Sequence, residues 1–284
     1  MPTVGSMLSN IRVIVGDPDR DFLSDAIGLD WVNQAQRRFS HKVLALDEIK
    51  DFTVTQYVPR FDVPTDTIIP LWAKWYKSRT AKLEYKPPDR FEKIMEGWPN
   101  ANGTPDIYTF FRRQVVVGPQ RPSTTSATAL ASGAMSSTVT TLNLTAASGT
   151  FRSKGWGIID SEVFEYTGVA TSTLTGVTRG VHGTNNTSHS SGTQLTEIDL
   201  QMGYRKTPAA LTATTASPEI PVAFHDYLEK YVLYLAWLAR GDSAKAQVAL
   251  MEFDGYEKEC IKTVGRRAQD GLMAINERWR ARWY

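Results

Sequence analysis

The chain has 284 residues, of which 42% are hydrophobic and 22% charged, and its net charge is +2. This length allows one large domain or two ordinary domains with a proper core, and the composition is that of a globular protein. A single cysteine, Cys260, excludes an intrachain disulfide. The N-terminus lacks the pattern of a secretory signal, and the longest apolar run, residues 231–239, is too short to cross a bilayer. We therefore expect a cytoplasmic or particle-borne protein.

The N-terminal region predicts two helices, residues 6–15 and 24–43, joined by a turn that contains Gly16 and Pro18. Ser24 can cap the second helix. Apolar residues in that helix recur at steps of three and four, which marks one buried face. They are Leu29, Val32, Ala35, Phe39 and Val43.

The next segment predicts strands at residues 52–58 and 67–76 and a short helix that begins at Pro87–Pro88 and ends at Met95. Residues 108–117 predict a hairpin with Arg112 and Arg113 at its tip. These strands are expected to form a small antiparallel sheet.

From residue 122 to residue 197 the chain is rich in Ser, Thr and Gly and almost lacks residues that favour a helix interior. Strand patterns occur at residues 139–144, 155–166, 173–180 and 192–196. Loop tips tolerate insertions, so a compact β unit inserted into a helical protein accounts for this change in composition and pattern.

After this stretch, residues 199–204 are expected to add a strand to the small sheet. Two helices follow, 222–240 and 244–264, which should pack as an antiparallel hairpin beside residues 31–39, with Asp242 or Ser243 capping the second. In the first the inner face is predicted to hold Phe224, Tyr227, Leu228, Tyr231, Leu235 and Leu238. In the second it is predicted to hold Val248, Met251, Phe253 or Tyr256, and Cys260, a small buried side chain.

The predicted fold class is therefore α+β: a helical body, meaning a helix bundle with a small antiparallel sheet, plus an inserted all-β domain. Residues 1–121 and 198–264 are assigned to the body, residues 122–197 to the inserted domain, and residues 265–284 to a C-terminal tail.

The C-terminal tail concentrates the positive charge of the chain. Residues 262–284 carry a net charge of +4, which leaves −2 for the remainder. A basic segment on a mildly acidic body suggests an acidic partner. The alternative is a solvated helix end whose cations interact favourably with the helix dipole.

With residues 122–197 set aside, the chain resembles the head-to-tail adaptors (connector rings) of tailed bacteriophages, of the podovirus tail-accessory-factor type. The resemblance rests on an ordered series of short motifs. They are Asp30–Ala35 in an early helix, Tyr57–Pro59, Thr104–Tyr108, Val117–Pro119, Tyr204–Pro208 and Ile220–Leu228. Residues 160–168, 174–184 and 189–193 resemble a small β module found in phage tail and baseplate proteins.

The resemblance implies a structural protein of the virion neck or tail, assembled in the host cytoplasm, that forms a ring of twelve subunits. Such a ring joins the portal vertex to the tail and lets DNA pass. The expected partners are the portal protein, a tail nozzle or hub protein, and further copies of this chain, with only transient contact with viral DNA and no membrane. A tail fibre bound through the inserted domain is an additional candidate partner.

The resemblance also implies that the C-terminal tail docks on the portal. Its arginine and aromatic residues are types that anchor interfaces. The residues assigned to portal binding are Arg266, Arg267, Arg278, Trp279, Arg280, Arg282, Trp283 and Tyr284. We expect the segment from about Gly265 to be mobile in the isolated protein and ordered in the particle. DNA binding by the tail is the competing hypothesis.

Two further surfaces are candidates for ring or DNA contacts. One is the hairpin tip with Arg112 and Arg113, and the other lies around Trp72, Trp75 and Trp98. A closed ring requires each subunit to present two different surfaces.

No catalytic residue, metal ligand or cofactor is assigned. Asp160, Glu162 and Glu165 lie near His182 and His189 in the sequence, but no metal-binding spacing is present. We expect Glu162 to pair with Arg179 across strands and the histidines to bond loop backbone groups.

Two alternative functions remain open. The first is a recognition module whose β domain binds a host glycan or tail fibre through Trp156, Phe164 and Tyr166, and the second is a lytic enzyme of the virion.

Overall fold

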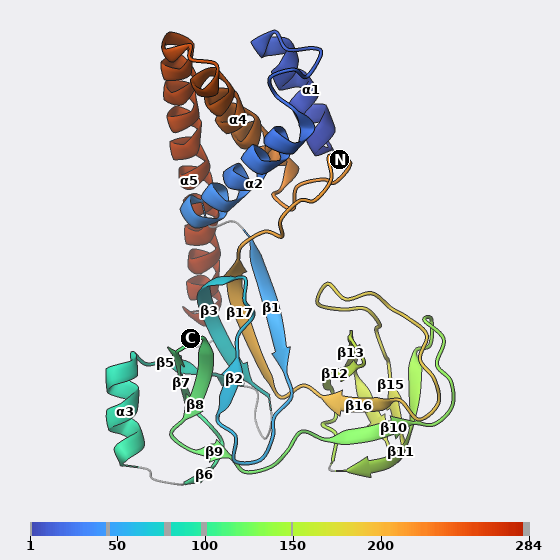
Figure 1. Cartoon of the computed structure of the whole chain (residues 1–284). Helices are drawn as coiled ribbons and strands as arrows, with labels where there is room; N and C mark the ends of the chain where they lie inside the picture. Colours follow the sequence, from blue (N-terminus) through green and yellow to red (C-terminus); the bar gives the residue numbers. More distant parts are fainter. Residues whose placement is uncertain (1, 44–45, 77–80, 98–100, 149, 281–284) are drawn as a thin grey trace. The chain divides into compact units, whose positions relative to one another are not determined.

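The computed structural model describes residues 2–280 apart from 44–45, 77–80, 98–100 and 149, and the fold is mixed α+β, as the sequence predicts. The described residues form two compact units (Figure 1). One contains residues 1–47 and 205–284 and is helical. The other contains residues 48–204 and consists mainly of strands.

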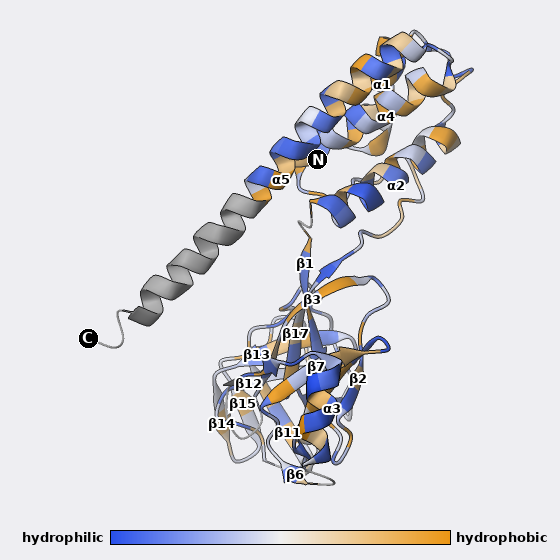
Figure 2. Ribbon diagram, turned by 90° about the vertical axis from the view of Figure 1, so that its left-hand side faces the viewer, coloured by the Kyte–Doolittle hydropathy of each residue, from blue (hydrophilic) through white to orange (hydrophobic). Residues whose placement is uncertain are grey.

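The helical unit contains α1 (Val4–Val15), α2 (Asp25–Lys42), a 3-10 turn η1 (Val222–Phe224), α4 (His225–Ala239) and α5 (Ser243–Arg280). Helices α4 and α5 pack against each other, and α1 and α2 pack on α4. Figure 2 shows α2 coloured mainly hydrophilic, whereas α1 carries several hydrophobic turns. The shared core includes Met7, Leu8, Ile11, Val32, Phe39, Tyr227, Leu228, Val232 and Phe253.

Short-range interactions set the helix ends and the contact between α1 and α2. Ser24 Oγ accepts a hydrogen bond from Ile27 N–H, so the predicted cap is confirmed. Gly16 ends α1 with φ 70°, a conformation that glycine adopts without strain. Gly28 lets α1 approach α2, because a Cβ there would lie 2.6 Å from the Leu8 methyl carbons. The four residues that we expected on the buried face of α2 after Leu29 are all buried, and Leu29 packs against the core.

The predicted inner faces of α4 and α5 are wrong at three positions. Leu238, Val248 and Met251 are exposed, by 52%, 59% and 65%. Alanines occupy buried positions of both helices instead: Ala236 in α4, and Ala246 and Ala249 in α5.

The predicted end of the last helix, near residue 264, is also wrong, because α5 continues to Arg280. Gly265 and Gly271 each cost a helix only about 1 kcal/mol relative to alanine. The neighbouring Arg, Ala, Gln, Leu and Met residues favour a helix, and no proline follows to stop it. The predicted cap of this helix is confirmed, since Asp242 Oδ1 accepts a hydrogen bond from Lys245 N–H.

In the second unit, two four-stranded sheets and a small two-stranded sheet surround one core. The first sheet has the order β1-β17-β3-β4 and the second the order β2-β8-β7-β5. Their strands are β1 (Asp47–Phe52), β2 (Arg60–Asp62), β3 (Thr67–Trp75), β4 (Ala81–Lys82), β5 (Glu84–Tyr85), β7 (Ile107–Phe111), β8 (Gln114–Gly118) and β17 (Leu200–Lys206). Strands β6 (Asn102–Gly103) and β9 (Arg121–Pro122) pair with each other, and α3 (Pro88–Glu96) packs on β7.

Strand β3, the β7–β8 hairpin, helix α3 and the strand after residue 199 all form, as predicted. The prediction of one small antiparallel sheet is wrong, because β3 and β17 lie in the first sheet and the β7–β8 hairpin in the second, where β5 pairs with β7 in parallel. The strand predicted at residues 52–58 is wrong, because β1 lies earlier and ends at Phe52. After Phe52 the chain turns, with Tyr57 at φ 64°, and Val54 bonds Ser126 instead of a neighbouring strand.

A seven-stranded sheet takes all its strands from residues 128–197. Its order is β13-β12-β16-β10-β11-β15-β14, with every described pairing antiparallel. The strands are β10 (Thr128–Ala131), β11 (Thr141–Ser148), β12 (Gly155–Ile159), β13 (Glu162–Tyr166), β14 (Gly168–Ala170), β15 (Thr173–Thr175) and β16 (Gln194–Glu197). This sheet has a core of its own, which includes Leu142, Ile159, Phe164, Tyr166, Leu174 and Leu195. We call residues 128–197 the β module.

Candidate interaction surfaces

Helix α5 is anchored to the helical unit by one polar cluster that the sequence analysis missed. Arg38 on α2 forms two hydrogen bonds with Glu257 on α5, at 2.9 and 3.0 Å. Tyr227 on α4 donates a third bond to Glu257, at 2.7 Å. Hydrogen bonds from Arg38 lower the pKa of Glu257 against the opposing effect of burial. Three helices thus meet at one carboxylate, which fixes the register of α5.

The predicted portal-binding residues lie on or beyond the end of this helix. The backbone of Arg266, Arg267, Arg278, Trp279 and Arg280 is helical, and their side chains lie outside the described part of the structure. Arg282, Trp283 and Tyr284 lie outside the described residues altogether. Their assignment stays a prediction.

Arg112 and Arg113 form the tip of the β7–β8 hairpin, as predicted. Both have positive φ, at 50° and 63°, in a two-residue loop that favours Asn and Gly. Arg113 donates a hydrogen bond to the Thr65 carbonyl at 2.7 Å, which ties the tip to the neighbouring loop. The Arg112 guanidinium lies 5.2 Å from the centre of the exposed Phe111 ring. Arg112 is therefore the better candidate for an external contact.

The tryptophan surface is not formed as predicted. Trp75 is buried in the core of the second unit. Trp72 is partly buried and lies directly against Gly203, where a Cβ would come within 2.3 Å of its ring. Trp98 lies outside the described residues. Alternation along β3 places these aromatic side chains against other strands, which the sequence alone did not reveal.

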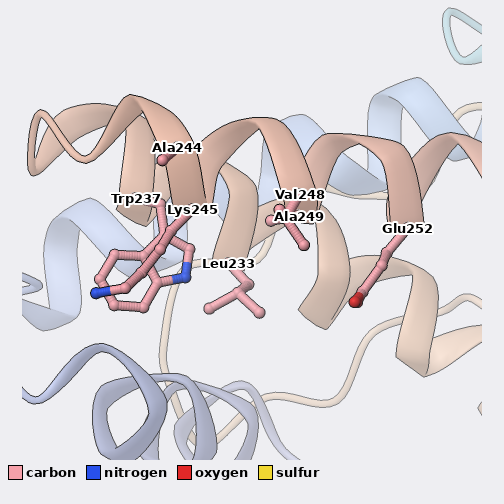
Figure 3. A pocket seen from close by; sticks show the side chains of 7 residues that line it. All are labelled: Leu233, Trp237, Ala244, Lys245, Val248, Ala249 and Glu252. Atoms are coloured by element: carbon pink, nitrogen blue, oxygen red, sulfur yellow. The ribbon is translucent and has the colours of Figure 1, made fainter.

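An uncovered apolar groove runs between α4 and α5 (Figure 3). Its lining consists of Leu233, Trp237, Ala244, Lys245, Val248, Ala249 and Glu252, around a space of about 330 Å³. The Lys245 ammonium lies 4.3 Å from the centre of the Trp237 ring. Exposed Leu238 and Met251 are further apolar residues of these two helices. Exposed apolar side chains gathered beside a groove make it a candidate protein interface.

Carboxylates and a histidine do meet in the β module, contrary to the expectation that the histidines bond only backbone groups. His189 lies between Asp160 and Glu162, with its ring nitrogens 2.7 and 2.9 Å from their oxygens. Arg179 donates two bonds to Glu162, at 2.5 and 2.6 Å, which confirms the predicted pair. Thr187 N–H donates a further bond at 2.9 Å.

This cluster is structural. Burial alone would raise the pKa of Glu162, but bonds from Arg179, Thr187 and His189 outweigh it and lower the pKa to about 2. The bonds join β13 to the long loop between β15 and β16, which has little regular structure of its own. Among the described residues no group of His, Cys, Asp and Glu side chains is arranged to hold a metal ion.

Buried polar contacts join the β module to the sheet beside it. The Arg152 guanidinium of the β module lies 3.6 Å from Asp199, next to β17, and also bonds Glu197 of the module itself at 2.9 Å. Ser126, two residues before the β module, donates through its Oγ to Asp199 at 2.7 Å and accepts from Val54 N–H at 2.8 Å.

A second group of contacts at this junction involves aromatic rings. Trp156 packs edge-on against Tyr76, and His182 bonds Asp51 at 2.7 Å. The hydrogen bond that Asp51 accepts from His182 raises the pKa of His182 against the opposing effect of burial. Together with the polar contacts, these rings hold the β module directly on its neighbouring sheet.

The aromatic residues considered for glycan binding are not available for it. Phe164 and Tyr166 are fully buried in the core of the β module. Trp156 lies at the junction between Tyr76 and His182. The recognition hypothesis therefore loses the residues that motivated it.

Cys260 is buried, as predicted, and burial raises its pKa to about 11, which disfavours the reactive thiolate.

No described helix has the length and apolar character that a membrane span requires. The described surfaces are those of a protein that assembles with other proteins: an anchored long helix, an uncovered apolar groove and an arginine-tipped hairpin.

Comparison with known families agrees with that class. The chain matches the SU10 adaptor protein family over residues 2–278, and it belongs to that family. It is therefore a phage adaptor protein and a virion component. A comparison with curated proteins finds no match.

Proposed function

We propose that the chain forms a ring that joins the portal vertex to the tail and lets DNA pass during packaging completion and ejection. The observation that carries this proposal is the family match, which extends over nearly the whole chain. An adaptor must bind proteins on two sides, and a closed ring also needs two different lateral surfaces on each subunit.

The length of helix α5 and the residues that it carries support portal docking. Helix α5 has 38 residues, against 15 in α4, and the Arg38–Glu257 cluster holds it within its first half. At a rise of about 1.5 Å per residue this helix is long enough to reach well past its hairpin partner. Its distal half carries the arginine and tryptophan residues assigned to portal docking.

The lateral contacts of the ring are proposed to use exposed residues of both units. The groove between α4 and α5 offers apolar surface, and the Arg112 tip offers a charged one. We place twelve copies in the ring and the β module, as an inserted domain of the tail and baseplate type, on its outer side, because the lumen must admit DNA.

Truncation after Gly265 tests the portal-docking role. Full-length chain and the truncated chain are mixed with purified portal rings and analysed by sedimentation. We expect the full-length chain to sediment with the portal and the truncated chain to remain free. Replacing Arg278, Arg280 and Arg282 with glutamine in a third sample separates loss of charge from loss of the whole segment.

A DNA-binding tail gives a different result in the same design. In that case the truncated chain would still sediment with portal rings, and its affinity for DNA would fall with a reduced dependence on salt concentration. Unchanged docking of the truncated chain would refute portal docking by the C-terminal tail.

A further inference from the structure

A cavity lies between α3 and the sheet β2-β8-β7-β5. Helix α3 rests directly on Gly118, where a Cβ would lie 2.7 Å from Met95 Sδ and 2.9 Å from a Phe91 ring carbon. With nine residues, or roughly 13 Å, α3 covers only part of this face of the sheet. The uncovered part forms a cavity of about 260 Å³. Its lining residues are Pro59, Arg60, Pro88, Phe91, Glu92, Met95, Thr109, Phe111, Val116 and Arg121.

A buried hydroxyl without a partner lies in the wall of this cavity. Along β7, Tyr108 and Phe110 pack on the aromatic cluster of one face, while Thr109 lines the cavity on the other. Thr109 is only 3% exposed, and its Oγ1 has no hydrogen-bond partner among the described residues. A buried polar atom in this state costs free energy, which a ligand group could recover by bonding it.

The rim of the cavity carries more positive than negative charge. Arg60 on β2 and Arg121 on β9 line it. Glu92 is the one acidic residue among the lining residues. Two guanidinium groups beside an apolar cavity favour an occupant that combines an apolar group with a carboxylate.

The size and place of the cavity favour a peptide over a free small molecule. Sites for drug-sized ligands occupy roughly 300–1,000 Å³, so this cavity suits an inserted side chain. Strand β2 is the edge of its sheet, so one side of its backbone has no strand partner in that sheet. An edge strand beside a side-chain pocket is a recurring arrangement for binding an extended peptide.

We propose that this cavity binds an extended peptide segment of another protein, which inserts one apolar side chain and places an adjacent carboxylate between Arg60 and Arg121. Thr109 Oγ1 then bonds a polar group of the bound segment. This site is independent of the ring proposal, because it rests on the second unit alone.

Methyl NMR of the full-length chain tests the proposal with a defined probe, the blocked tetrapeptide glycyl-leucyl-aspartyl-glycine amide. We expect saturable shifts of the methyl signals of Met95, Thr109 and Val116 at peptide concentrations up to about 10 mM. The matched peptide with asparagine in place of aspartate should bind at least about fivefold more weakly.

Three variants sharpen the test. Arg60→Gln and Arg121→Gln should each weaken binding of the aspartyl peptide about fivefold or more, and should abolish its advantage over the asparagine peptide. Arg90→Gln is the matched control, because Arg90 is an exposed arginine of α3 that does not line the cavity. Unchanged signals outside the cavity establish that each variant is folded.

Either of two results would overturn the proposal. The first is the absence of saturable shifts at the three methyl groups over this concentration range. The second is equal binding of the two peptides to the unsubstituted chain. A failure here would leave the portal-docking proposal untouched, since truncation after Gly265 does not alter the cavity.

Discussion

Replacing Glu162 with glutamine should destabilise the β module and remove part of its acid sensitivity. Glu162 is buried and accepts bonds from Arg179, Gly180 N–H, Thr187 N–H and His189. Its pKa falls from an ordinary 4.5 to about 2, which corresponds to about 3 kcal/mol of stability. Glutamine keeps the shape but leaves the Arg179 charge buried without its counter-ion, a change that costs about 3–5 kcal/mol.

The sign of the pH effect follows from the lowered pKa. The contribution of Glu162 is fully present above pH 4.5 and is lost as the pH falls from 4.5 to about 2. Glu162→Gln should therefore be about 3 kcal/mol less stable than the unsubstituted chain at pH 7, and nearly equal to it near pH 2.

The assay is hydrogen exchange of peptides from β12 and β13, because the two compact units need not unfold together. Glu84→Gln is the control, because Glu84 forms an ion pair with Lys86 at the surface. Loss of this exposed ion pair should lower the stability by less than about 1 kcal/mol. Two results would show that the Glu162 bonds do not stabilise the β module as expected. One is a destabilisation by Glu162→Gln of less than about 1 kcal/mol at pH 7, and the other is a difference in stability between this variant and the unsubstituted chain that persists at pH 2.

Three further predictions concern the second unit, and each is tested by hydrogen exchange of peptides from its strands, which gives the free energy of unfolding of that unit. Thr109→Val should raise the free energy of unfolding by about 1 kcal/mol, since it removes an unpaired buried hydroxyl; a decrease would mean that the hydroxyl is bonded. Ser126→Ala should lower it by about 1–3 kcal/mol, because Val54 N–H and Asp199 both lose their bond to Ser126; Ser123→Ala is the control. Arg112→Asn should raise it by about 0.5 kcal/mol, because asparagine adopts positive φ more readily, and the same variant should weaken ring assembly if Arg112 contacts a neighbouring subunit.

Local patterns were sufficient to predict several elements of the fold. Ser24 and Asp242 act as the expected caps because capping depends on a few neighbouring residues. The β12–β13 and β7–β8 hairpins form as predicted because the strand patterns on either side of each short turn fix them locally, although Arg112 and Arg113 are not the residues that a two-residue turn favours. The Glu162–Arg179 pair was also predictable, because Arg179 is the single arginine between residues 153 and 204.

Features that depend on distant parts of the chain could not be predicted in this way. The burial of Ala249 in place of Val248 depends on how closely α4 approaches α5. Trp75 is buried among residues from several strands, which its own neighbours in the sequence do not reveal. The Arg38–Glu257 bonds join residues far apart in the sequence, and the cavity beside Thr109 exists only because α3 is too short to cover its sheet.

Electron microscopy of the neck of the purified particle tests ring formation and portal docking together. We expect a closed ring of this chain between portal and tail, with the segment from Gly265 to the C-terminus bound to the portal. A neck in which this chain forms no ring, or in which that segment extends into solvent without touching the portal, would contradict it.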